Sequence, residues 1–156
     1  MQTLFKTLTI GAILAIGTGA ALAADAVVGT WKLNLAKSMF SPGPAPKSQT
    51  RTFAESVQGI TVTIKTMAAN GKESTTTASY KVDGKPYAVS GNTDFDMISL
   101  TRVDASTTNI TQTKAGATVA TGARTVSKDG KTLTVTLKGT HADGGKFDDV
   151  LVFDRQ

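Results

Sequence analysis

The stretch Asp129-Gly130-Lys131-Thr132-Leu133-Thr134-Val135-Thr136-Leu137-Lys138 shows how most of this chain is built. Its Asp-Gly pair supplies the positive φ angles of a two-residue β-turn, which predicts a hairpin. After the turn, apolar residues alternate with threonine at a period of two. Such alternation is typical of a strand with one buried and one wet face. The unit therefore predicts antiparallel β-structure.

Similar units recur along the chain. Three more strong turn motifs are Asn70-Gly71-Lys72, Asp83-Gly84-Lys85 and Asp143-Gly144-Gly145-Lys146, each interpreted as a tight hairpin. Weaker turn motifs lie at Gln58-Gly59, Ser90-Gly91-Asn92, Asp104-Ala105-Ser106 and Ala115-Gly116. Between the turns, apolar residues continue to alternate with polar ones. The apolar residues that share a face include Trp31 with Leu33 and Leu35, Val62 with Ile64, Tyr80 with Val82, Tyr87 with Val89, and Phe147 with Leu151 and Phe153. The chain contains 26 Thr, a β-branched polar residue that suits half-buried strands. We expect about ten strands and no helix longer than one turn.

An antiparallel sheet of that many strands must hide its edges, either by closing into a barrel or by splitting into a sandwich. We predict an all-β fold with a single antiparallel meander barrel of about 8–10 strands. Val27-Val28 and Val150-Leu151-Val152 suit first and last strands that pair to close it. Ser41 to Lys47, with three prolines, cannot supply a regular ladder. We interpret it as a loop that either crosses the barrel end or forms a fixed rim over a barrel mouth.

The first 23 residues have the pattern of a secretory signal peptide. Lys6 supplies the positive charge, Leu8–Ile16 is largely apolar, and Ala21-Leu22-Ala23 is a small-x-small cleavage site. The alternative, a membrane anchor, requires about 20 apolar residues, more than this stretch offers. We therefore expect residues 1–23 to be removed and residues 24–156 to form one domain. The destination is the periplasm or the medium, and we expect no membrane segment in the mature chain.

Composition excludes several classes of function. The chain has no Cys and one His, so it has neither a disulfide framework nor a thiolate or multi-histidine metal site. Its net charge of +5 comes from scattered lysines instead of a basic patch, which argues against nucleic acid. His141 lies in a predicted turn, where a solvated role is expected instead of general base catalysis. Neither acidic pair, Asp94 with Asp96 or Asp148 with Asp149, matches a calcium loop. We predict no enzyme activity, catalytic residue, metal or cofactor.

The opening of the mature chain, Gly29-Thr30-Trp31-Lys32-Leu33, resembles the Gly-x-Trp start of lipocalins and the Gly-Thr-Trp opening of fatty-acid-binding proteins. The ending Val150-Leu151-Val152-Phe153-Asp154-Arg155 resembles the last strand of the second group. Thr93-Asp94-Phe95 is similar to the lipocalin Thr-Asp-Tyr. The resemblance implies a lipocalin-like barrel that binds a small molecule, and the N-terminal signal is similar to bacterial export sequences, which implies a bacterial secreted member of this group. In such a barrel, Trp31 would plug the closed end while Gly29 lets the backbone pass closely.

The sequence also departs from these families. Fatty-acid-binding proteins carry two helices after the first strand, where this chain has the Pro-rich loop. They hold a carboxylate with an Arg-x-Tyr pair on the last strand, and here Leu151 and Phe153 fall at those positions. An inward-pointing cation could replace that pair. Arg51 is in phase with Phe53 and Arg124 with Val126, so either could meet an acidic ligand. Alternatively, Arg51 lies at the strand start and Arg124 stacks on Trp31 as a structural closure.

The leading hypothesis is a monomeric, secreted, non-enzymatic barrel that binds a small apolar or amphipathic ligand. The residues predicted to hold this ligand are Phe53, Tyr80, Tyr87, Arg124 and Arg51. The alternative is a barrel with a filled core that serves as a structural or protein-interaction component of the envelope and has no small-molecule site. The two hypotheses differ in cavity volume, because alternation shows which side chains point inward but not whether they meet at the axis.

Overall fold

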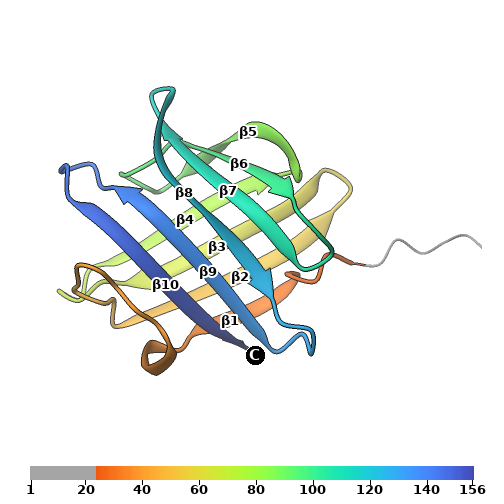
Figure 1. Cartoon of the computed structure of the whole chain (residues 1–156), viewed down its shortest axis with the longest axis horizontal. Helices are drawn as coiled ribbons and strands as arrows, with labels where there is room; N and C mark the ends of the chain where they lie inside the picture. Colours follow the sequence, from red (N-terminus) through yellow and green to blue (C-terminus); the bar gives the residue numbers. More distant parts are fainter. Residues whose placement is uncertain (1–23) are drawn as a thin grey trace, which may run out of the picture.

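The computed structural model describes residues 24–156, which form ten antiparallel strands (Figure 1). The strands are β1 (Gly29–Leu33), β2 (Ser48–Ser56), β3 (Gly59–Met67), β4 (Glu73–Tyr80), β5 (Asp83–Ser90), β6 (Met97–Arg102), β7 (Thr107–Lys114), β8 (Ala117–Val126), β9 (Thr132–Thr140) and β10 (Lys146–Arg155). One 3-10 turn, η1 (Leu35–Lys37), is the only helical element in this part of the chain. The predicted signal peptide lies outside the described residues. Across residues 24–156, no helix is long and apolar enough to cross a membrane.

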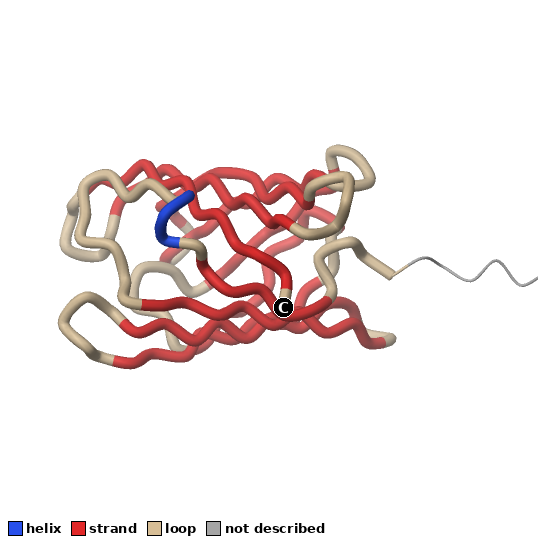
Figure 2. The backbone as a smooth tube through the Cα atoms, turned by 90° about the horizontal axis from the view of Figure 1, so that it is seen from below, coloured by secondary structure: helices blue, strands red, loops and turns tan. Residues whose placement is uncertain are grey.

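The sheet closes on itself. Each strand pairs with its neighbours in the chain, and β1 also pairs with β10, with Trp31 opposite Arg155. Figure 2 shows the strands wrapped around a common interior, with the loops gathered at the two ends. The weakest seam lies between β4 and β5, which share two register pairs, Thr77 with Ser90 and Ala78 with Val89. The predicted ten-strand meander and its closure by the first and last strands are confirmed, as expected for a sheet that must avoid open edges. The first strand is shorter than predicted: Val27 and Val28 precede it, and Leu35 lies in η1, where it is 44% exposed.

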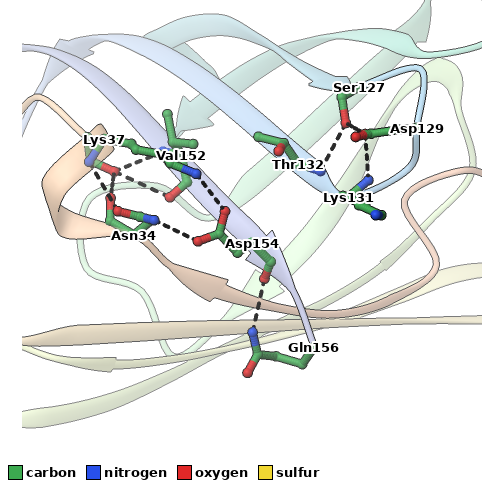
Figure 3. A network of polar contacts seen from close by, with 10 residues as sticks. Asn34, Lys37, Ser127, Asp129, Lys131, Thr132, Val152, Asp154 and Gln156 are labelled. Carbon is green, nitrogen blue, oxygen red and sulfur yellow. Dashed lines mark hydrogen bonds and ion pairs between the residues drawn. The ribbon is translucent and has the colours of Figure 1, made fainter.

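The four Asx-Gly motifs share one local hydrogen bond. In each, the Asn or Asp side chain accepts a hydrogen bond from the backbone amide two residues later, at 2.9 to 3.1 Å, as Asp129 does from Lys131 (Figure 3). Three motifs connect β3 to β4, β8 to β9 and β9 to β10 as predicted. The turn predicted at Asp83-Gly84 lies where the chain reverses, because the two β4–β5 pairs, Thr77 with Ser90 and Ala78 with Val89, are centred on it. The two strands separate before they reach it, so the tight hairpin does not form. There the β5–β6 register shifts between Asp83 and Pro86.

One end of the barrel is closed by Trp31 and Arg155. The buried Trp31 ring donates its Nε1–H to the Val27 carbonyl at 2.7 Å, and the Arg155 guanidinium lies 4.1 Å from the ring centroid. Arg155 also donates hydrogen bonds of 2.6 to 2.7 Å to three backbone carbonyls, those of Ala26, Val28 and Gly130. Gly29 has a φ of +134°, and a Cβ there would lie 2.5 Å from Arg155 Nη1, so the close passage requires glycine. The expectation that Arg124 stacks on Trp31 is wrong, because Arg155 faces Trp31 directly across the β1–β10 ladder.

The core fills this closed half of the barrel. Its largest fully buried side chains come from strand segments next to the closed end: Trp31, Tyr80, Leu100, Leu133 and Phe153. Each such apolar side chain stabilises the fold by about 1.5–3 kcal/mol relative to an exposed one. The hydrophobic positions predicted by alternation in β9, Leu133 and Val135, are both buried.

On the outer wall, a polar network fixes η1 to the last strand (Figure 3). Asn34 caps the turn by accepting the Lys37 amide at 3.2 Å, and its Nδ2 donates to Asp154 Oδ2 at 2.6 Å. Lys37 Nζ pairs with the other Asp154 oxygen at 3.3 Å. A hollow of about 390 Å³ lies beside this network. These contacts hold η1 against β10.

Candidate functional site

The end of the barrel opposite Trp31 contains a cavity of about 720 Å³. Its rim is formed by four connections: the Pro-rich loop, the β3–β4 turn, the β5–β6 loop and the β9–β10 turn. Its inner wall is formed by side chains of β2, β3, β4, β7, β8, β9 and β10. The barrel is therefore filled in one half and hollow in the other.

The Pro-rich loop forms part of the rim, which favours the second of the two interpretations of this segment. Phe40, Pro42, Pro44 and Pro46 all line the cavity. Ser41 anchors the loop to β10: its carbonyl accepts the Asp148 amide at 2.7 Å, and its amide donates to Asp149 Oδ1 at 3.0 Å. Since proline restricts the backbone, the rim is preformed.

The inner wall has an apolar part and a polar part. Ile64, Leu137 and Leu151 supply the apolar part, together with Val119 and Ala120. The polar part consists of Gln49, Arg51, Thr66, Thr76 and Gln112. Thr76 and Gln112 are only 9% and 8% exposed. A wall of this kind can accept a molecule that carries both apolar and polar groups.

Arg51 is the cation of the inner wall. Its Nε donates to Gln49 Oε1 at 2.9 Å, and Gln49 Nε2 in turn donates to Thr66 Oγ1 at 2.9 Å. The Arg51 guanidinium also lies 4.6 Å from the ring centroid of Phe153. Burial, aided by the nearby Arg124 charge and opposed by Tyr80, lowers the pKa of Arg51 to about 10. Arg51 is therefore still protonated at neutral pH.

Arg124 belongs to a cluster beneath the cavity. It is 4% exposed and donates through Nη1 to the Tyr80 hydroxyl. Its guanidinium lies 5.4 Å from the Phe53 ring centroid and 5.5 Å from that of Tyr80. Burial raises the pKa of Tyr80 against the opposing effect of the Arg124 charge, so the hydroxyl stays protonated. Arg124 Nη2 is buried without a hydrogen-bond partner among the described residues.

The five predicted site residues are thus brought together only in part. Arg51 lines the cavity, while Phe53, Tyr80 and Arg124 form the cluster below it and are absent from its lining. Tyr87 packs partly against the core from β5, and its hydroxyl donates to Asp83 Oδ2 at 2.9 Å. A ligand-holding role for these five residues remains a prediction.

Sequence reasoning missed Gln49, Thr76 and Gln112. Gln49 precedes Arg51 by two residues, so the period-two pattern that places Arg51 inside also places Gln49 inside. Gln112 follows the buried Ile110 by two residues, so the same pattern places Gln112 inside. The period-two pattern therefore contains the signal for these residues, although a polar side chain is ordinarily expected on the wet face.

At the rim, Asp94 and His141 connect two loops that are distant in sequence. His141 Nδ1 lies 3.0 Å from Asp94 Oδ2, and the Ala142 amide donates to Asp94 Oδ1 at 2.9 Å. The His141 ring packs on Phe147 with 4.5 Å between centroids. His141 is solvent-exposed as expected, with 45% of its side chain accessible, and its contacts with Asp94 and Phe147 hold the ring in place. Within residues 24–156, no group of three or more His, Asp or Glu side chains gathers as a metal site.

Comparison with known proteins supports the fold. No protein-family model and no curated protein sequence matches this chain. Among solved structures, it is similar to zebrafish ileal bile acid-binding protein complexed with cholic acid, with a TM-score of 0.50 and 12% sequence identity. The match covers 84% of this chain and 99% of that one. At this identity the similarity shows the fold alone, and it confirms the predicted all-β antiparallel barrel.

Proposed function

We propose that this protein is a monomeric, non-enzymatic carrier that binds an apolar or amphipathic small molecule inside its barrel. We also propose that the signal peptide expected at residues 1–23 directs it to the periplasm or the medium. The single observation that carries the binding proposal is the cavity of about 720 Å³. Ligand sites in proteins commonly measure roughly 300–1,000 Å³.

The composition of the wall supports an amphipathic ligand. The apolar side chains of Ile64, Leu137 and Leu151 can cover a hydrophobic body, while the polar part of the wall can meet a polar group. The preformed Pro-rich rim reduces the entropy that must be lost when a ligand is enclosed. A protein with the same fold is complexed with cholic acid, which adds support by analogy of fold alone.

The cavity also separates this proposal from the filled-core alternative. Only the closed half of the barrel is packed through, around Trp31 and Phe153. A barrel with a purely structural role would be more stable with a filled interior, because unfilled volume lowers the free energy of unfolding. Native mass spectrometry distinguishes the carrier from the filled-core barrel directly.

Native mass spectrometry of the mature chain, exported by its own N-terminal segment and purified without detergent or denaturant, tests the proposal. A discrete extra mass that is lost on organic extraction is the expected result, and its value identifies the ligand. A bare polypeptide that also shows no thermal shift with a broad panel of lipids and metabolites contradicts the proposal, since a ligand that prefers the native state must stabilise it.

A pair of variants places the ligand in the cavity. Leu137→Trp fills the apolar wall and should abolish the extra mass, because the indole occupies ligand space. Lys138→Trp adds the same group to the neighbouring residue on the outside of the barrel and should leave the extra mass unchanged. Equal retention in both variants would place the ligand elsewhere on the molecule.

A further inference from the structure

Arg51 carries a charge that the protein itself does not balance. Arg102 pairs with Asp25, and Arg155 binds three carbonyls. Arg124 binds the neutral Tyr80 hydroxyl and leaves its Nη2 unpaired among the described residues, but it lies outside the cavity lining. Arg51 donates one hydrogen bond to the neutral amide of Gln49 and stacks on the neutral Phe153 ring. No carboxylate of residues 24–156 lies within 4.0 Å of its guanidinium.

We propose that Arg51 binds the negatively charged group of the cavity ligand, which makes this ligand an amphipathic carboxylate. This inference rests on the proposed function, because it specifies the chemistry of the molecule that the cavity takes up. It differs from the resemblance discussed above in where the head group lies. The corresponding positions on the last strand are Leu151 and Phe153, both buried and apolar, so recognition moves to β2.

The electrostatics of the interior favour an anion. A cation removed from water is costly unless a counter-charge or several hydrogen bonds replace the lost hydration. Arg124 adds a second positive charge to the same interior, and each arginine is unfavourable for the other. An anion that enters the cavity is attracted by the Arg51 charge. The two carboxylates of the cavity lining, Asp94 and Asp149, already accept hydrogen bonds from the Ala142 and Ser41 amides.

The geometry favours a carboxylate. Gln49 fixes Arg51 Nε, Thr66 fixes Gln49, and the Phe153 ring supports the guanidinium plane, so the side chain is held in place before ligand binds. Among the described residues, no hydrogen bond engages Nη1 or Nη2 of Arg51. These two groups form the planar fork that arginine uses to bind carboxylates through two parallel bonds.

Arg124 does not serve as the head-group anchor in this arrangement. It lies outside the cavity lining, with the Phe53 and Tyr80 rings against its guanidinium. Its charge still raises the positive potential beneath Arg51. We therefore expect Arg124 to contribute at a distance, without contact to the ligand.

Binding of two matched probes by isothermal titration calorimetry tests the inference. Dodecanoic acid and 1-dodecanol share the same twelve-carbon chain and differ in the charged group. The native protein should bind the acid at least about tenfold more tightly, which corresponds to one charge-assisted interaction. Arg51→Gln should weaken binding of the acid by roughly 10- to 100-fold and leave the alcohol nearly unchanged. Arg51→Lys retains the charge without the fork and should fall between the two.

Lys65→Gln is the matched control. It removes one positive charge from the exposed face of the adjacent strand β3 and should leave both affinities unchanged. Thermal melts establish that each variant folds, and Arg51→Gln should melt no lower than the native protein because a half-buried charge without a counter-charge is removed. Equal affinity for acid and alcohol, unaltered in Arg51→Gln, would overturn the carboxylate inference while leaving the carrier function in place. Failure of the native protein to bind either probe or any native ligand would instead overturn the proposed function, and this inference with it.

Discussion

Replacement of Arg155 by alanine should be among the most damaging single changes at the closed end. Arg155 donates to the carbonyls of Ala26, Val28 and Gly130 at 2.6 to 2.7 Å and stacks on Trp31 at 4.1 Å. Three charge-assisted hydrogen bonds contribute about 1 kcal/mol each where water can partly replace them. The cation–π contact adds about 1 kcal/mol. We therefore expect Arg155→Ala to lower the free energy of unfolding by about 4 kcal/mol and Tm by roughly 15 °C.

Urea denaturation followed by Trp31 fluorescence measures this loss, because the buried indole reports directly on the closed end. Arg155→Lys is the informative companion, since an ammonium keeps the charge but cannot span three carbonyls, and it should lose about half as much. Hydrogen exchange at the Val27 and Val28 amides should accelerate in both variants, because these amides bond to Asp25 within the segment that Arg155 holds. A loss below about 1 kcal/mol for Arg155→Ala would refute the view that this side chain closes the barrel.

Two further predictions concern a carboxylate and a turn. Burial raises the pKa of Asp25, but hydrogen bonds and the charge of Arg102 outweigh it, so the pKa lies below its ordinary value. The stability that Asp25 contributes is therefore complete above the unfolded-state pKa near 4, and it is lost as pH falls through the folded-state pKa. Asp25→Asn should consequently flatten the dependence of Tm on pH between about 5 and 2. Ala115 has a φ of +49° and precedes Gly116 at +82°, a type I′ geometry that disfavours alanine. Ala115→Asn should raise the free energy of unfolding by about 0.5–1 kcal/mol in urea titrations, and a decrease would contradict this interpretation of the turn.

Local sequence patterns predicted the strands well because they depend on near neighbours in the chain. Alternation reports which side chains share a face, and Leu133 and Val135 are buried as that pattern requires. The Asx-Gly motifs predicted three turns through hydrogen bonds that span two residues. The motif at Asp83 marks the centre of the β4–β5 reversal, but its tight hairpin does not form, because these two strands pair only at Thr77 with Ser90 and Ala78 with Val89. Such pairing is a long-range property.

The site was predicted less completely for a similar reason. Alternation correctly placed Arg51, Phe53, Tyr80 and Arg124 on the inner side of the sheet. It did not reveal their depth along the barrel axis, since depth depends on how each strand is staggered against its neighbours. Three of these residues therefore lie in the cluster beneath the cavity, and Arg51 alone among them lines it.

Residue order by itself determined the class of structure: turns that reverse the chain, strands with one apolar face, and enough strands that an open edge would be a liability. Tertiary structure decided which arginine meets Trp31, where packing ends and the cavity begins, and that no carboxylate of the described chain faces Arg51. The physical reason is the range of the interactions. Alternation and turn geometry act over a few residues, whereas closure brings Trp31 and Arg155 together from opposite ends of the described chain. Charge balance inside the barrel exists only after that closure.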